Sequence, residues 1–248
     1  MTFDRRKTQA IVLCDLHLSD NNSLVVDSFL RLLGLVHQHK LNLYILGDLF
    51  LVWLGPRRLH SCLQSTIVEK LYFLKAQGQS IVYVEGNRDF FIKENLEHLC
   101  FSKVIRRNEV VNIGNIPTLL LHGDGLNKSD WPYRSFRYLT KNRLSQIMLS
   151  CAGGRWPSKL AEDVEFLLQN TNQKHKMQTA IPELFFESLQ KLANEKKAER
   201  VMMGHFHLQQ TFCGHPEIYI VKDFLDGQYF LTVSHDGDLQ YHQMKDVS

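Results

Sequence analysis

Short apolar runs that alternate with helical patterns are the feature that most constrains the fold of this chain. Residues 10–14, 43–46 and 81–84 form runs of strand length, and helical patterns occupy residues 24–36 and 59–76 between them. This alternation predicts a parallel sheet whose neighbouring strands are joined by right-handed helical crossovers.

A different pattern follows the third of these strands. A short helical piece is expected at residues 92–99, and strands at residues 110–113 and 118–121 flank a Gly114-Asn115 turn, as in a hairpin. Residues 131–190 are largely helical in pattern, with breaks at glycines and prolines. Further strands, without long helices between them, are expected near Val201, Thr211, Tyr219, Phe230 and Leu239.

Polar blocks directly follow five of the predicted strands. Because the carboxyl ends of parallel strands lie along one edge of a sheet, we expect these blocks to converge on one crevice. Asp-x-His and His-x-His spacings put both side chains on the same side of an extended chain, as two ligands of one metal require. A single block is an ordinary turn, but five in this arrangement favour a metal site. The blocks are Asp15-Leu16-His17, Gly47-Asp48, Gly86-Asn87-Arg88-Asp89, His122-Gly123-Asp124 and Gly204-His205-Phe206-His207.

The candidate ligands in these blocks are carboxylates, an amide and imidazoles. Mixed imidazole and carboxylate donors suit manganese, iron, zinc or similar divalent ions. Seven ligands are too many for one ion, so the sequence predicts two metals, with Asp48 in the middle strand as the bridging carboxylate. The seven candidates are Asp15, His17, Asp48, Asn87, His122, His205 and His207.

Composition excludes some classes of protein and divides the chain into two parts. With 248 residues, 44% of them hydrophobic, the chain can bury a sizeable core, and its formal net charge of +3 is too small to indicate nucleic-acid binding. Residues 126–180, however, contain nine basic and four acidic residues. Residues 131–161 contain no acidic residue, so a basic helical cap that meets an anionic partner is favoured over an ordinary solvated face.

The cysteines and the hydropathy of the chain bear on its location. Five cysteines occur without any Cys-x-x-Cys pair, which favours reduced thiols in the cytoplasm. No apolar run approaches the roughly 18 residues of a membrane span, and the N-terminus does not resemble a secretory signal. We therefore expect a cytoplasmic protein, with a membrane surface still open as a binding partner.

The order of the blocks resembles that of the calcineurin-like metallophosphoesterase superfamily over residues 11–207, and more closely that of the UDP-2,3-diacylglucosamine diphosphatases of lipid A biosynthesis. This resemblance implies an α/β fold, a four-layer α-β-β-α sandwich. Residues 1–125 and 181–248 would form its core, and residues 126–180 an inserted helical lid. The segments that carry the resemblance are residues 44–50 with Trp53 and Gly55, residues 86–90, and residues 122–124 with Asp130 and Tyr133.

The same resemblance assigns roles to individual residues. One metal would be held by Asp15, His17, Asp48 and His207, and the second by Asp48, Asn87, His122 and His205; manganese is the expected ion. Asn87, Arg88 and His122 would act at the reacting phosphate. Substrate would also be bound by lid residues, namely Asp130, Tyr133, Asn172 and Lys176. Asp89 and Asp124 are candidates to orient the ligand histidines.

Arg88 is informative about the leaving group. Many members of the superfamily have a histidine at this position, and a protonated imidazole can give a proton to a leaving alcohol. An arginine guanidinium does not deprotonate at working pH, so it supplies only charge and paired hydrogen bonds to phosphate oxygens. Arg88 therefore favours a leaving group that is stable as an anion, such as the phosphate released from a pyrophosphate.

The expected reaction is metal-dependent hydrolysis of the pyrophosphate bond of UDP-2,3-diacylglucosamine to 2,3-diacylglucosamine 1-phosphate (lipid X) and UMP, by a hydroxide bridging the two metals. The expected partners are this nucleotide-linked glycolipid and an anionic membrane surface, at the cytoplasmic face of the inner membrane. No nucleic acid and no obligate protein partner is indicated.

Two alternatives stay open. One is a metallophosphoesterase of other specificity, a nucleotide pyrophosphatase or phosphodiesterase, and the other is a non-catalytic binding scaffold. Leu51, Phe206 and Leu208 depart from residues that are common in the resembled family, as does the segment that begins at Pro56. These positions face substrate, so they bear on substrate identity rather than on hydrolysis.

Overall fold

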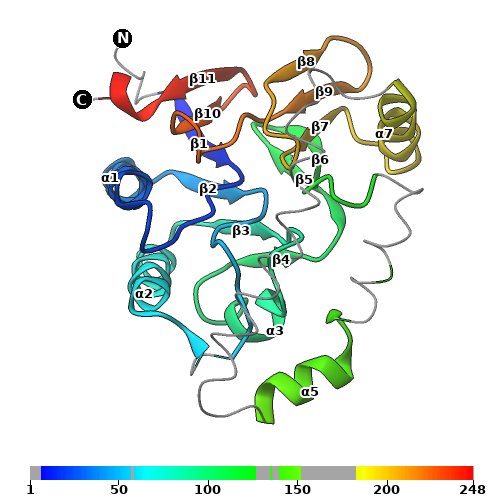
Figure 1. Cartoon of the computed structure of the whole chain (residues 1–248). Coiled ribbons are helices and arrows are strands. Elements are labelled where there is room, and N and C mark those ends of the chain that lie inside the picture. Colours follow the sequence, from blue (N-terminus) through cyan, green and yellow to red (C-terminus); the bar gives the residue numbers. More distant parts are fainter. Residues whose placement is uncertain (1–6, 57–58, 127–134, 136–139, 152–182, 248) are drawn as a thin grey trace.

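The computed structural model describes residues 7–56, 59–126, 135, 140–151 and 183–247. Their strands form two sheets (Figure 1). The first has six strands in the order β11-β10-β1-β2-β3-β4, in which β1 to β4 are parallel and β10 and β11 are antiparallel to their neighbours. Its strands are β1 (Thr8–Leu13), β2 (Asn42–Ile45), β3 (Ile81–Val84), β4 (Lys103–Ile105), β10 (Tyr229–Ser234) and β11 (Leu239–Gln243).

The second sheet has five strands in the order β5-β6-β7-β9-β8. Strands β6, β7 and β9 are parallel, and β5 and β8 pair antiparallel at the two edges. The expected hairpin around Gly114-Asn115 is confirmed as β5 and β6. The strands are β5 (Asn108–Ile113), β6 (Ile116–Leu121), β7 (Arg200–Met203), β8 (Gln210–Phe212) and β9 (Glu217–Ile220).

Helices cover the outer faces of both sheets. Figure 1 shows α1 and α2 beside the six-stranded sheet and α7 beside the five-stranded one. None of the helices in the described ranges is long and apolar enough to cross a bilayer. The helices are α1 (Ser23–His39), α2 (Cys62–Ala76), α3 (Ile92–Leu96), α5 (Arg143–Cys151) and α7 (Glu183–Glu195), with a 3-10 turn η2 (Met244–Asp246).

Alternate side chains of β1 face two different layers, as the period of a strand requires. Ile11 and Leu13 pack in the apolar cluster that includes α1 and α2, whereas Ala10 and Val12 pack in the cluster between the two sheets. A third cluster joins the outer face of the five-stranded sheet to α7. The layers therefore follow the order helix, sheet, sheet, helix, and the expected four-layer α/β sandwich is confirmed.

Several element boundaries differ from the sequence-based expectation. Helix α2 begins at Cys62 rather than at residue 59, because the Ser61 side chain accepts a hydrogen bond from Gln64 N while the Gln64 side chain accepts one from Ser61 N. This reciprocal cap fixes the first turn. Strand β4 was not predicted, and α3 ends at Leu96 rather than at residue 99. Of the inserted segment at residues 126–180, the structure describes only residues 126, 135 and 140–151.

Candidate metal centre

The five polar blocks follow strands of both sheets. The blocks at Asp15, Asp48 and Asn87 follow β1, β2 and β3 of the six-stranded sheet, while those at His122 and His205 follow β6 and β7 of the other. The expectation of a single sheet edge is therefore corrected: the blocks meet where the ends of two stacked sheets face one another.

Glycines allow the two sheets to approach closely at this end. A Cβ atom on Gly204, directly after β7, would lie 2.7 Å from Asp15 Oδ2 and 2.7 Å from Cys14 Cβ. Within the six-stranded sheet, a Cβ on Gly86, which follows β3 by two residues, would lie 2.2 Å from Asp48 Oδ1. Both distances are shorter than real contacts, so a larger residue at either position would push the candidate ligands apart.

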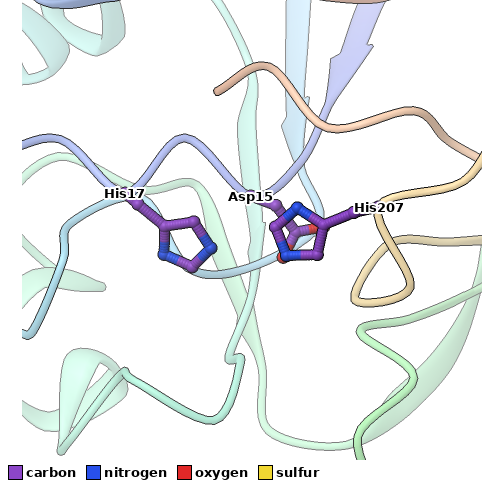
Figure 2. Close-up of side chains that lie close together, drawn as sticks. All are labelled: Asp15, His17 and His207. Atoms are coloured by element: carbon purple, nitrogen blue, oxygen red, sulfur yellow. The ribbon is translucent and has the colours of Figure 1, made fainter. Parts of the chain in front are cut away.

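Asp15, His17 and His207 form the first group of candidate ligands. Figure 2 shows the two imidazoles and the Asp15 carboxylate together, although His207 comes from the far end of the chain. Their ligand atoms lie within 4.8 Å of one another, and the ring centres of His17 and His207 are 5.6 Å apart. Three such donors can hold one divalent ion.

Asp15, Asp48 and His122 form a second group with ligand atoms within 4.8 Å. Asn87 joins it, because its Oδ1 lies 3.1 Å from His122 Nε2. The His205 ring centre lies 5.0 Å from that of His122. The structure thus brings all seven candidate ligands together, with Asp15 in both groups; the bridging role of Asp48 stays a prediction.

The backbone of five of these ligands is left-handed. Asp15, His17, Asp48, His205 and His207 have φ angles of 50°, 46°, 52°, 72° and 53°. Side chains other than glycine rarely adopt such angles, and residues that do so cluster at functional sites. Backbone hydrogen bonds from Asp15 N to Gly47 O and from His17 N to Asp48 O hold two of them.

The charges at the site fit divalent cations. Asp15 and Asp48 are buried, and Asp15 Oδ1 has no hydrogen-bond partner in the part of the chain that the structure describes. Burial raises the pKa of Asp48 and the Asp15 charge raises it further, although His122 and Arg88 lower it. Two buried carboxylates close together, next to imidazole and amide groups, are the donor set that a pair of divalent ions would stabilise.

A hydrogen bond fixes how His122 can bind a metal. Its Nδ1 lies 2.7 Å from the carbonyl oxygen of Leu46, and since a carbonyl only accepts, Nδ1 carries the proton. Nε2 then faces Asn87 and lies 3.7 Å from Asp48 Oδ2. Although burial lowers the pKa of His122, Asp48 and Asp15 raise it above its ordinary value. A metal would replace the proton that this negative field attracts to Nε2.

Asp223 was not predicted as a site residue, yet it contacts a candidate ligand. It is fully buried after β9, and its Oδ2 lies 3.4 Å from His207 Nδ1. Burial raises the pKa of Asp223, but the hydrogen bond and charge of His207 lower it below its ordinary value. Lys222 Nζ lies 3.1 Å from Asp223 Oδ1 and donates to the His207 carbonyl oxygen. Such a carboxylate orients a ligand histidine and fixes which ring nitrogen faces the metal.

Asp89 does not have the histidine-orienting role expected for it. Its Oδ2 accepts hydrogen bonds from Gly86 N, Asp48 N and Tyr83 Oη, so it holds the loop that follows β3. Burial, with Asp48 nearby, raises the pKa of Asp89 to about 6. Asp89 therefore positions the backbone of two ligand-bearing segments.

Arg88 lies inside the site. Its side chain is 4% exposed, its Nη1 donates to the Leu51 carbonyl oxygen over 3.1 Å, and its Nε lies 3.8 Å from Asp48 Oδ2. Its backbone N donates to Asp48 Oδ1. The guanidinium therefore lies beside the candidate metal ligands. The predicted lid contacts, namely Asp130, Tyr133, Asn172 and Lys176, lie outside the described residues.

Comparison with known proteins shows which sequences and which folds this chain is similar to. No family model matches the chain. A UDP-2,3-diacylglucosamine hydrolase of Stutzerimonas stutzeri strain A1501 is 30% identical over 238 residues, which cover 94% of this chain and 97% of that protein. One of Serratia proteamaculans strain 568 is 29% identical over 200 residues, covering 79% and 81%. Among solved structures, an archaeal phosphodiesterase is similar with a TM-score of 0.51 and 11% identity, covering 94% and 98%.

The likeness to the archaeal phosphodiesterase concerns the fold alone. Two stacked sheets with helices outside, and Asp, Asn and His side chains gathered at the shared strand ends, agree with the fold and the candidate site that the resemblance to the calcineurin-like metallophosphoesterases implies. The hydrolase of Stutzerimonas stutzeri, 30% identical over 94% of this chain, identifies the family more narrowly than the fold does. The chain belongs to the UDP-2,3-diacylglucosamine hydrolase family.

Proposed function

We propose that this chain is the hydrolase that cleaves the pyrophosphate bond of UDP-2,3-diacylglucosamine and releases 2,3-diacylglucosamine 1-phosphate and UMP. The observation that carries the proposal is the set of seven metal-ligand candidates at one site. The chain matches a UDP-2,3-diacylglucosamine hydrolase over 94% of its own length and 97% of that protein. Five of these candidates, including both buried carboxylates, have the left-handed backbone that clusters at functional sites.

Asp15, His17, Asp48 and His207 would hold one divalent ion, and Asp48, Asn87, His122 and His205 the other. When bound, such ions supply positive charge for phosphoryl oxygens and activate water for attack. We propose manganese as the ion, because imidazole, amide and carboxylate donors without a thiolate suit it. A metal panel on the apoprotein tests this; higher activity with zinc or magnesium than with manganese would contradict it.

The protein's own residues then account for binding and orientation. Arg88 would pair with phosphoryl oxygens and neutralise the charge that grows on them, and the Asn87 amide would contact the same phosphate. A new bond joins a water oxygen to one phosphorus, the bridging P–O bond breaks, and a phosphate monoester leaves. Arg88 gives no proton to this leaving group, and a phosphate needs none.

Residues 126–180 would form a lid over the lipid part of the substrate. The described helix α5 supports this role, because Leu144 and Ile147, three residues apart on one face, are 67% and 52% exposed. Asp130, Tyr133, Asn172 and Lys176 are proposed to bind the sugar and phosphates from this lid. Its basic charge would bring the protein to an anionic membrane surface at the cytoplasmic face of the inner membrane.

The decisive assay supplies purified protein with UDP-2,3-diacylglucosamine in neutral detergent micelles and divalent metal, and measures UMP. We expect UMP and the lipid monophosphate in equal amounts. Absence of UMP, or faster hydrolysis of nucleotide diphosphates that carry no lipid, would contradict the proposed substrate and favour another specificity within the superfamily.

The membrane proposal is tested separately. Vesicles with anionic lipid should bind the protein, vesicles of zwitterionic lipid should not, and salt should release it, because attraction of basic residues to the surface is screened within about 8–10 Å at physiological salt. Equal sedimentation with both kinds of vesicle would contradict an electrostatic membrane contact.

A further inference from the structure

Lys141 joins the inserted segment to the loop after β3, in which two of the candidate catalytic residues lie. Its Nζ donates a hydrogen bond of 2.6 Å to the carbonyl oxygen of Gly86, 55 positions earlier in the sequence. The same ammonium lies 5.2 Å from the centre of the Phe90 ring, close enough for a cation–π contact. Lys141 therefore contacts both ends of residues 86–90, between which Asn87 and Arg88 stand.

The peptide groups at Gly86 are held from two directions. Gly86 N donates to Asp89 Oδ2 over 2.7 Å, and the Gly86 carbonyl oxygen accepts from Lys141. That carbonyl shares a planar peptide unit with the nitrogen of Asn87. Rotation of this unit would move Asn87, whose Oδ1 lies beside His122 Nε2. The hydrogen bond from Lys141 thus restrains a backbone unit next to a candidate metal ligand.

Asp89 ties the same loop to a second ligand-bearing segment. Its Oδ2 accepts hydrogen bonds from the backbone N–H groups of Gly86 and Asp48. The hydrogen bond from Lys141 therefore reaches a loop that is itself bonded to the segment carrying Asp48.

We propose that Lys141 is a positioning residue that couples the inserted segment to the catalytic loop, residues 86–90. With Lys141 in place, the loop holds Asn87 and Arg88 in the geometry that hydrolysis needs. Without it, the peptide unit between Gly86 and Asn87 loses this restraint. The proposal rests on the proposed function, because it concerns the same site, and it adds a residue that does not itself touch the reacting atoms.

The test compares kinetic constants in neutral micelles for wild type and three variants. Lys141→Met keeps the length of the side chain but removes the donor and the charge; we expect kcat to fall about 10-fold with KM changed less than about twofold, since misplaced catalytic groups lower kcat. Lys141→Arg should recover most of kcat, because a guanidinium can donate to the same carbonyl and stack on Phe90. Lys191→Met, on the exposed face of α7, is the matched control and should equal wild type.

A second readout does not need activity. Amide hydrogen exchange of residues 86–90 should be faster in Lys141→Met than in wild type, Lys141→Arg and Lys191→Met, with exchange in β7 unchanged as a check on folding. Equal exchange in all four proteins overturns the proposal. A raised KM with unchanged kcat also overturns it, because Lys141 would then bind substrate. If wild type itself releases no UMP, the proposed function fails, while the exchange rates still decide the role of Lys141.

Discussion

Five left-handed residues at the candidate metal site have a cost that the rest of the fold must offset. An L-residue in this region is disfavoured by roughly 1 kcal/mol or more. The Asp15 carboxylate accepts the backbone N–H of His205, and the His17 N–H donates to Asp48 O, so ligands restrain one another's backbone. The left-handed backbone therefore places the candidate ligands correctly but lowers the stability of these loops.

Removing the charge of Asp48 should abolish hydrolysis. Asp48→Asn keeps the shape of the side chain but removes the negative charge that would offset two divalent ions, and we expect kcat to fall by about 100-fold or more with less metal bound. Steady-state kinetics and elemental analysis of the purified protein measure both effects. Asp27→Asn, an exposed change of the same kind on α1, is the control; wild-type activity in Asp48→Asn would exclude Asp48 from the site.

A substitution at Asp223 tests whether this carboxylate orients His207 for metal binding. Because loss of a carboxylate that orients a ligand imidazole costs about 10- to 100-fold in metal affinity, Asp223→Asn should bind manganese more weakly by that factor. Titration calorimetry on the apoprotein measures the affinity. Asp226 contributes only its backbone N–H to Asp223 and has an exposed side chain, so Asp226→Asn should bind as wild type does. Equal affinities for the two variants would rule out the orienting role.

The seven candidate ligands could be picked out from the sequence because each stands in a short polar block at the end of a strand. Asp223 obeys the same rule, since it follows β9, a strand parallel to β7. It was missed because Lys222-Asp223 contains neither glycine nor histidine and so looks like an ordinary turn. The contact between Lys141 and Gly86 has no sequence signal at all, because only the fold brings these positions together.

At the scale of elements, the two sheets approach each other closely between the ends of β1 and β7. Gly204→Ala would place a methyl group 2.7 Å from Asp15 and Cys14, so we expect a loss of about 1–3 kcal/mol in unfolding free energy and weaker metal binding. Gly34→Ala is the matched control: Gly34 is exposed in α1 with nothing within 4 Å, and alanine there should stabilise by about 1 kcal/mol. Denaturant unfolding measures both; no loss of stability in Gly204→Ala would contradict the close approach.

Most elements could be predicted from their periodicity, and the exceptions have physical causes. Strand β4 is only three residues long, Lys103–Ile105, too short for an alternating pattern to stand out. The start of α2 could have been found from Ser61 and Gln64, whose spacing is that of a capping box. Strand periodicity shows which side chains are buried, but it does not show which of two sheets a strand joins.

At the scale of the whole molecule, the layer order came from the resemblance to a known superfamily rather than from the pattern of residues. The pattern of apolar residues alone predicted that all five polar blocks lie at the edge of a single parallel sheet. The second sheet depends on β6, β7 and β9 pairing with one another rather than with β1. Such pairing is decided by long-range packing, here by the apolar cluster that Val12, Leu120 and Met202 share between the sheets.

Because the ligands come from both sheets, metal should stabilise the entire fold. Chelation leaves the buried Asp15 and Asp48 carboxylates close together without a divalent ion between them. Manganese at about 100 times its dissociation constant should add about 2.7 kcal/mol, which raises the melting temperature of a chain of this size by about 5–10 °C. Scanning calorimetry with EDTA and with manganese measures the shift. Asp48→Asn should show a smaller shift, and an unchanged melting temperature in wild type would contradict a structural coupling between metal and fold.

The distance in sequence between the two halves of the metal site also matters while the chain is being made. Asp15, Asp48 and Asn87 leave the ribosome long before His205 and His207, and β7 must pair with β6 before the last ligands reach the others. A product of premature termination that stops short of β7 therefore lacks part of the ligand set. We therefore expect a chain that ends before β7 to be inactive, because it lacks His205 and His207.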